Sequence, residues 1–173
     1  LLLLVLPLWL FAAQVKAEYF TITRYDIAVT FAADGSADFV ETIEVRFTEP
    51  RHGIFRFIPY HDVINGEAVD RLIKDVGVEG FKFATSKEEN YNLLIKIGSA
   101  DSYVEGTQVY RINYHVVNPL NFFEDGHTEF YWDLLGIKWT VEIENFSFKL
   151  NFPDQVNLTS EKVGATTGVA GST

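Results

Sequence analysis

Apolar and polar residues alternate along two neighbouring segments of the chain, separated by a short turn. One face of the first segment carries Tyr25, Ile27, Val29 and Phe31. One face of the second carries Phe39, Ile43, Val45 and Phe47. Asp34-Gly35 lies between them, and this dipeptide accepts the positive φ angles of a tight turn. Period-two alternation on both sides of such a turn predicts a β-hairpin.

Similar alternation recurs through the rest of the chain. Further strands are predicted at residues 72–78, 81–85, 91–97, 108–117, 128–133 and 141–152. Turn residues separate these segments, and no segment has a convincing helical period with capping residues. The pattern predicts an all-β protein, an antiparallel two-sheet β-sandwich (Ig-like or related) with about seven to eight strands.

The two ends of the chain differ from its middle. Residues 1–13 are an apolar run broken by Pro7, and Val15 and Ala17 suit the signal-peptidase pockets, so residues 1–17 are predicted to be a signal peptide. An uncleaved anchor or a buried helix is the alternative, although the run is shorter than a membrane span. Residues 18–156 then form the β-sandwich domain, and residues 157–173 are a Gly/Ser/Thr-rich linker or the start of a missing region. With no Met and no basic leader, we expect the chain to be part of a longer reading frame.

Composition narrows the possible partners. The chain has 14 Lys+Arg against 24 Asp+Glu, a net charge of −10, which disfavours nucleic acid and anionic lipid headgroups. It has no Cys, which excludes disulfides, thiol catalysis and thiolate metal sites. Its 47% hydrophobic and 15% aromatic residues are enough for a sizeable core.

Two segments and the turn at residues 33–36 (ADGS) resemble a known family. The segments are residues 49–59 (EPRHGIFRFIP) and 129–139 (EFYWDLLGIKW), the second continuing to Pro153. In their order and spacing they resemble the N-terminal region of the predicted bacterial membrane proteins known as domain of unknown function 2207, over roughly residues 19–153. The resemblance implies an extracytoplasmic β-domain after a signal peptide, with transmembrane helices elsewhere in the protein. It implies no activity, because that of the family is unknown.

The basic residues Arg51, His52 and Arg56 form a local cluster in an acidic chain and are expected in a loop around Gly53. One hypothesis is an anion or carboxylate clamp. The other is a structural ion pair between Arg56 and Glu129 or Asp133, because buried charges persist chiefly when paired. If the segment is extended, Arg56 shares its face with Ile54 and Ile58, which favours burial.

Aromatic residues next to carboxylates form the second candidate cluster. Tyr131, Trp132 and Trp139 lie near Glu129 and Asp133, an arrangement that could stack on sugars and accept hydrogen bonds from their hydroxyls. The alternative is ordinary core packing, since aromatic residues dominate sandwich cores. The alternation places Trp132 on the same side as Phe130, facing inward.

No further chemistry is predicted. The four histidines lack the spacing of a metal site, and no nucleophile motif or acid–base pair appears, so we expect no enzyme, no metal and no cofactor. The sequence favours a non-catalytic domain at the extracytoplasmic face of a bacterial cell membrane, attached through helices outside this fragment. Its expected partner is a protein or a cell-wall glycan, and a secreted carbohydrate-binding module is the alternative.

Overall fold

The computed structural model describes residues 19–64, 66–136, 138–154, 156 and 164. These residues form twelve strands and no helix. The predicted signal peptide and nearly all of the predicted linker lie outside the described residues. Within the described part of the chain, no helix has the length and hydropathy needed to cross a membrane.

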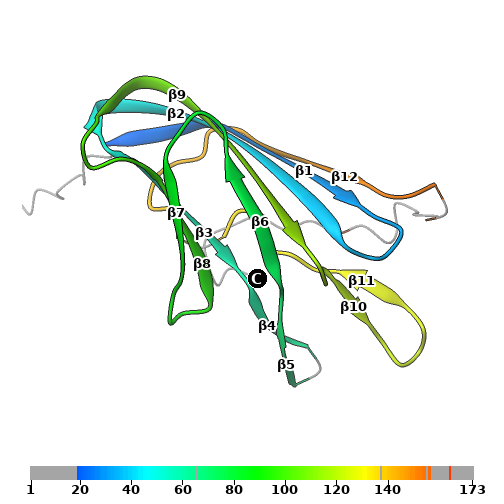
Figure 1. Ribbon diagram of the computed structural model, residues 1–173. Helices are drawn as coiled ribbons and strands as arrows, with labels where there is room; N and C mark the ends of the chain where they lie inside the picture. Colours follow the sequence, from blue (N-terminus) through cyan, green and yellow to red (C-terminus); the bar gives the residue numbers. More distant parts are fainter. Residues whose placement is uncertain (1–18, 65, 137, 155, 157–163, 165–173) are drawn as a thin grey trace, which may run out of the picture.

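The strands form one large sheet, one smaller sheet and two hairpins (Figure 1). The large sheet has the order β12-β1-β2-β9-β6 and contains β1 (Phe20–Phe31), β2 (Ala37–Arg51), β6 (Ile73–Val78), β9 (Val104–Val116) and β12 (Phe146–Asn151). The smaller sheet has the order β3-β8-β7 and contains β3 (Gly53–Pro59), β7 (Phe83–Lys87) and β8 (Asn92–Gly98). The hairpins pair β4 (His61–Ile64) with β5 (Glu67–Asp70), and β10 (Leu120–Phe122) with β11 (Thr128–Phe130).

The predicted first hairpin is confirmed as β1–β2. The strands pair antiparallel, with Thr30 opposite Asp38 next to the turn. Local side-chain chemistry fixes this turn: the Asp34 carboxylate accepts a hydrogen bond from the Ser36 backbone N–H at 3.0 Å, and Gly35 has φ +86°. The turn fixes the pairing register of β1 and β2, so the alternation of apolar residues determines which face of each strand points inward.

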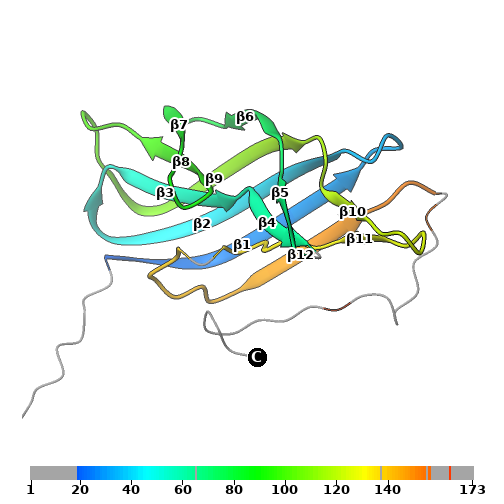
Figure 2. The same ribbon diagram turned by 90° about the horizontal axis from the view of Figure 1, so that it is seen from below.

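The three-stranded sheet lies against one face of the five-stranded sheet, and Figures 1 and 2 show it from two directions. Inward side chains of both sheets form one hydrophobic core. The large sheet contributes, among others, Tyr25, Val29, Phe39, Ile43 and Ile112 to this core. The small sheet contributes Ile54, Ile58, Ile95 and Ile97. Burial of these apolar faces contributes about 25 cal/mol per Å² removed from water.

A crossing segment, described over residues 131–136 and 138–145, lies between β11 and β12. It brings the chain back so that β12 runs parallel to β1, with Tyr25 opposite Phe146. A parallel pair cannot be closed by a tight turn. Here all the other strands lie between β1 and β12 in the sequence, and the crossing segment is the last part of that connection. The segment also carries the backbone carbonyls that complete the buried cluster described below.

The all-β class is confirmed, but the predicted strand count is wrong. The described residues form twelve strands rather than seven or eight, in four sheets rather than two. One pairing, β1 with β12, is parallel and not antiparallel. The segment around Gly53, expected to be a loop, is strand β3. The count was low because the short strands β4, β5 and β10 are too brief to show a clear alternation.

Candidate functional site

A buried ionic cluster lies between the two sheets and begins with an acid in the core. Glu41 sits in β2 on the inward face, between Phe39 and Ile43, and its side chain has no exposed surface. It stands opposite Ile27 of β1 and Ile112 of β9. A carboxylate in such a position requires a cation and several donors.

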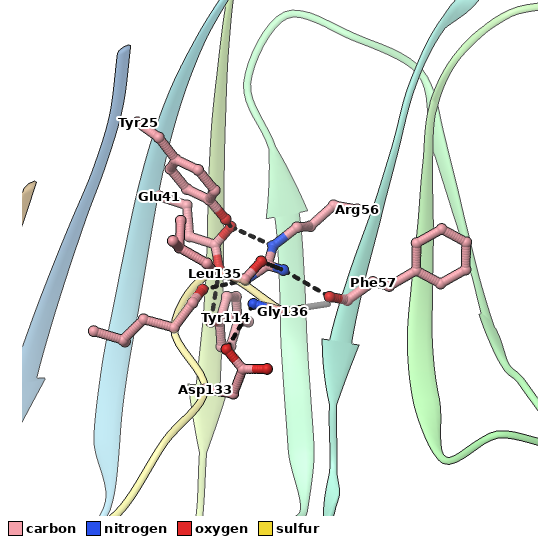
Figure 3. A network of polar contacts seen from close by, with 9 residues as sticks. Tyr25, Glu41, Arg56, Phe57, Tyr114, Asp133, Leu135 and Gly136 are labelled. Atoms are coloured by element: carbon pink, nitrogen blue, oxygen red, sulfur yellow. Dashed lines mark hydrogen bonds and ion pairs between the residues drawn. The ribbon is translucent and has the colours of Figure 1, made fainter. Parts of the chain in front are cut away.

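Arg56 of β3 supplies the cation from the opposite sheet (Figure 3). Its side chain is 1% exposed and lies between Ile54 and Ile58, on the face that the alternation predicted. Its Nε donates to Glu41 Oε2 at 2.8 Å and its Nη2 to Glu41 Oε1 at 2.9 Å. This two-pronged geometry is the strongest form of arginine–carboxylate pair.

Three backbone carbonyls take the remaining donors of Arg56. Nη1 donates to the Phe57 carbonyl at 2.6 Å and to the Leu135 carbonyl at 2.9 Å, and Nη2 donates to the Leu134 carbonyl at 2.8 Å. All five N–H groups of the guanidinium are therefore used. The cluster joins both sheets to the crossing segment.

Two tyrosines complete the shell around Glu41. The Tyr25 hydroxyl donates to Oε2 at 2.6 Å and the Tyr114 hydroxyl to Oε1 at 2.8 Å, so each carboxylate oxygen accepts two hydrogen bonds. Burial raises the pKa of the Tyr25 phenol well above its usual value, an effect that the Arg56 charge offsets in part. Burial by itself would lower the pKa of Arg56, but the charge of Glu41, its hydrogen bond and the two tyrosines together outweigh it, and the pKa rises. The side chains of Glu41 and Arg56 are closed to solvent.

The partner predicted for Arg56 was wrong. Glu41 pairs with Arg56, whereas Glu129 and Asp133 are both exposed. Asp133 acts indirectly: its carboxylate accepts a hydrogen bond from the Gly136 backbone N–H at 2.9 Å. The turn that results points the Leu134 and Leu135 carbonyls at Arg56. Glu129 lies in β11 and makes no side-chain hydrogen bond or ion pair with the described residues.

The three predicted basic residues do not form a clamp. The Arg51 guanidinium lies over the Tyr19 ring, 3.6 Å from its centroid, and reaches Glu49 at 3.9 Å. His52 places Nδ1 at 3.1 Å from the Ser99 carbonyl, and its ring lies tilted against that of exposed Tyr103, with the centroids 4.2 Å apart. Arg56 is enclosed between the sheets. Each of the three therefore serves a different local contact.

The predicted aromatic cluster is divided between core and surface. Trp132 packs on Phe39 with the ring centroids 5.0 Å apart, which confirms its predicted inward direction. Trp139 packs edge-on against Tyr25 at 6.1 Å. Tyr131 is 63% exposed. Of the three rings of the predicted sugar platform, Tyr131 is exposed, whereas Trp132 and Trp139 are partly buried.

The charged residues of one surface hollow and the other three histidines contact residues close to them. A hollow of about 680 Å³ lies on the outer face of β1, β2 and β12, where Arg46 pairs with Glu144 at 2.8 Å and Arg24 with Asp26 at 2.5 Å. His61, His115 and His127 each pair with one nearby aspartate. No group of three or more metal-ligating side chains occurs among the described residues.

Glu41 is the central residue that sequence reasoning missed. The pattern of β2 already carried a signal, because Glu41 occupies an inward position in a row of apolar residues. An acid at such a position indicates a buried partner, although nothing in the local sequence identifies it. Arg56, at an inward position of β3, carried the matching signal.

Comparisons with known proteins give distant structural likenesses. Leukotriene A4 hydrolase from Saccharomyces cerevisiae is 12% identical, with a TM-score of 0.39 over 56% of this chain and 15% of that chain. An M1 zinc metallopeptidase from Deinococcus radiodurans is 11% identical, with a TM-score of 0.35 over 58% of this chain and 20% of that chain. A two-domain M1 zinc metallopeptidase bound to L-arginine is 11% identical, with a TM-score of 0.42 over 78% of this chain and 33% of that chain. The chain spans a third or less of these proteins, and likenesses this distant carry no functional argument.

The family comparison is more informative. No curated protein matches the chain. The model of one family, described as the predicted membrane protein (DUF2207) N-terminal domain, matches residues 21–171. This match includes the β1–β2 hairpin, Glu41 and Arg56, and the crossing segment. The chain belongs to the DUF2207 family and corresponds to the N-terminal domain of its predicted membrane proteins.

Proposed function

We propose that this chain is the non-catalytic extracytoplasmic domain of a membrane-anchored bacterial envelope protein, and that it acts by binding a partner at the outer face of the membrane. The observation that carries the proposal is the closed ionic cluster. Its most reactive groups, Glu41 and Arg56, use every hydrogen-bonding position on each other, on two tyrosines and on backbone carbonyls. Such a cluster supports a rigid scaffold and not a site that exchanges protons with a substrate.

The membrane part of the proposal rests on family membership. The family is described as a predicted membrane protein, and this chain matches its N-terminal domain. An extracytoplasmic position agrees with the apolar start of the chain. A net charge of −10 favours a partner with a basic or neutral surface over one with an anionic surface.

Cysteine labelling in intact cells tests the orientation. The chain has no Cys, so Ala84→Cys can be introduced on the exposed strand β7 of the full-length protein, with any cysteines elsewhere replaced by serine. We expect a membrane-impermeant maleimide to label this position in intact cells. Val29→Cys is the matched control, because Val29 has no exposed surface and its thiol should react only after unfolding. Labelling of Ala84→Cys only after the cells are opened would place the domain in the cytoplasm and refute the proposal.

A carbohydrate-binding module is the second candidate, and the exposed ring of Tyr131 supports it. We expect Trp139→Ala to lower the free energy of unfolding by about 3 kcal/mol, the low end for an aromatic residue of the core, because Trp139 packs on Tyr25 but is only partly buried. Tyr131→Ala should change it by less than about 0.5 kcal/mol, as an exposed substitution does. Urea titration measures both values. Binding of cell-wall polysaccharide by the wild type but not by Tyr131→Ala would favour this candidate, and no binding by either would remove it.

A further inference from the structure

A second buried arginine, Arg71, lies where the connection between β5 and β6 meets the connection between β9 and β10. Its side chain is covered to the same degree as the core, with the residue 5% exposed. Its Nη1 donates to the Asn118 backbone carbonyl at 3.0 Å, and its Nη2 donates to Asn121 Oδ1 at 2.5 Å. Both acceptors are neutral.

Arg71 differs from Arg56 in lacking a counter-charge. Arg56 has a carboxylate at 2.8 Å, whereas Arg71 forms no ion pair with the described residues. Burial lowers the pKa of Arg71, and the more distant charge of Asp62 offsets this only in part. Buried guanidinium groups are normally paired, because removing the charge from water costs several kcal/mol per ion.

The amide of Asn121 supplies a second, independent observation at the same place. Its Oδ1 accepts from Arg71, while its Nδ2 is buried and has no hydrogen-bond partner. The amide cannot be turned around, because this would place its NH₂ group against the guanidinium donor. Asn121 Nδ2 is one of five such buried side-chain atoms among the described residues, and of the five it is the one bonded through its own amide to the Arg71 guanidinium. A buried donor of this kind calls for an acceptor from water or a ligand.

The surrounding backbone holds these two donors in place. Asn118 Nδ2 donates to the Asp70 carbonyl at 3.0 Å, and the Leu72 backbone N–H donates to Asn118 Oδ1 at 2.8 Å. The Val117 backbone N–H donates to the Leu72 carbonyl at 3.0 Å. The Arg71 guanidinium and the Asn121 amide are therefore presented by two connections bonded to each other.

We propose that Arg71 and Asn121 form a binding site for a carboxylate. A carboxylate supplies the negative charge that Arg71 lacks and an acceptor for Asn121 Nδ2, and its planar geometry suits a guanidinium. The carboxylate belongs either to a small molecule or to an acidic side chain of a polypeptide. Exposed apolar residues next to the site in the sequence, Leu72, Val117 and Phe122, offer a polypeptide additional contacts. The site stands on its own geometry and does not depend on the proposed extracytoplasmic role.

Acetate titration of the full 173-residue chain tests the proposal. We expect a saturable rise in melting temperature, together with a saturable NMR shift of the Asn121 side-chain amide. Asn121→Asp places a carboxylate beside Arg71 within the chain, so it should raise the melting temperature without acetate and weaken the acetate response by at least about tenfold. Asn90→Asp is the matched control, because it makes the same charge change in an exposed loop and keeps an acceptor for Asn92. Arg71→Gln should also lose the response.

Peptides with blocked ends distinguish the two sources of the carboxylate. A peptide with one glutamate between leucines is compared with its glutamine counterpart. Tighter binding of the glutamate peptide than of acetate indicates a polypeptide ligand, and binding of acetate alone indicates a small carboxylate. The same acetate response in the wild type, Asn121→Asp and Asn90→Asp, or no saturable shift of the Asn121 amide, would overturn the proposal.

Discussion

Arg56→Met is expected to lower the free energy of unfolding by about 3–5 kcal/mol, because it leaves Glu41 buried without a counter-charge. Methionine keeps much of the aliphatic volume, so the loss reports on the charge and its hydrogen bonds. Three carbonyls, those of Phe57, Leu134 and Leu135, lose their donor as well. Urea titration with an unchanged m-value measures the effect. Arg46→Met is the control, since its pair with Glu144 is exposed and is worth about 0–1 kcal/mol.

The partner of Arg56 is identified by a double-mutant cycle. Glu41→Gln combined with Arg56→Met should cost less than the sum of the two single changes, by about 0.5–3 kcal/mol. The lost stability is not fully recovered, because a glutamine at position 41 offers the Tyr25 and Tyr114 hydroxyls one neutral oxygen where Glu41 offers two carboxylate oxygens. Glu129→Gln should show no coupling to Arg56. A loss below about 1 kcal/mol for Arg56→Met would show that the ion pair is not enclosed as described.

Alanine at Gly53 or Gly98 is expected to cost more than the roughly 1–3 kcal/mol of backbone strain alone. The two glycines face each other at one end of the β3–β8 pair, with φ +126° and +125°. A Cβ on Gly53 would lie 1.9 Å from the Ile97 carbonyl oxygen, and a Cβ on Gly98 would lie 1.8 Å from the His52 carbonyl oxygen. Both clashes involve backbone, so relief requires moving the strands apart.

Gly106→Ala provides the matched control. Gly106 also has a positive φ, +63°, but a Cβ there meets nothing within 4 Å. Its cost should therefore stay near the roughly 1–2 kcal/mol of the left-handed conformation. Thermal or urea unfolding of the three variants compares them directly. Equal losses at all three positions would show that the close approach of β3 and β8 does not constrain Gly53 and Gly98.

Much of the cluster could be predicted from the sequence one residue at a time. The alternation around Arg56 predicted that it faces the core, and Glu41 occupies an inward position that the same rule could have flagged. Tyr25 was also predicted on the face where it is found. The sequence did not predict that these side chains contact one another. Glu41 and Arg56 lie in different sheets, and several acids stood at plausible positions.

Local chemistry by itself determined the all-β class, the β1–β2 hairpin and the inward face of the main strands, because alternation and turn residues act over a few neighbours. Only the tertiary structure decided that Glu41 is the partner of Arg56, that β12 returns parallel to β1, and that Trp139 packs on Tyr25. These contacts join residues far apart in the sequence, and they depend on how the two sheets and the crossing segment pack together. The periodicity of a strand predicts which way a side chain points, but the packing of the sheets determines which side chains it contacts across the core.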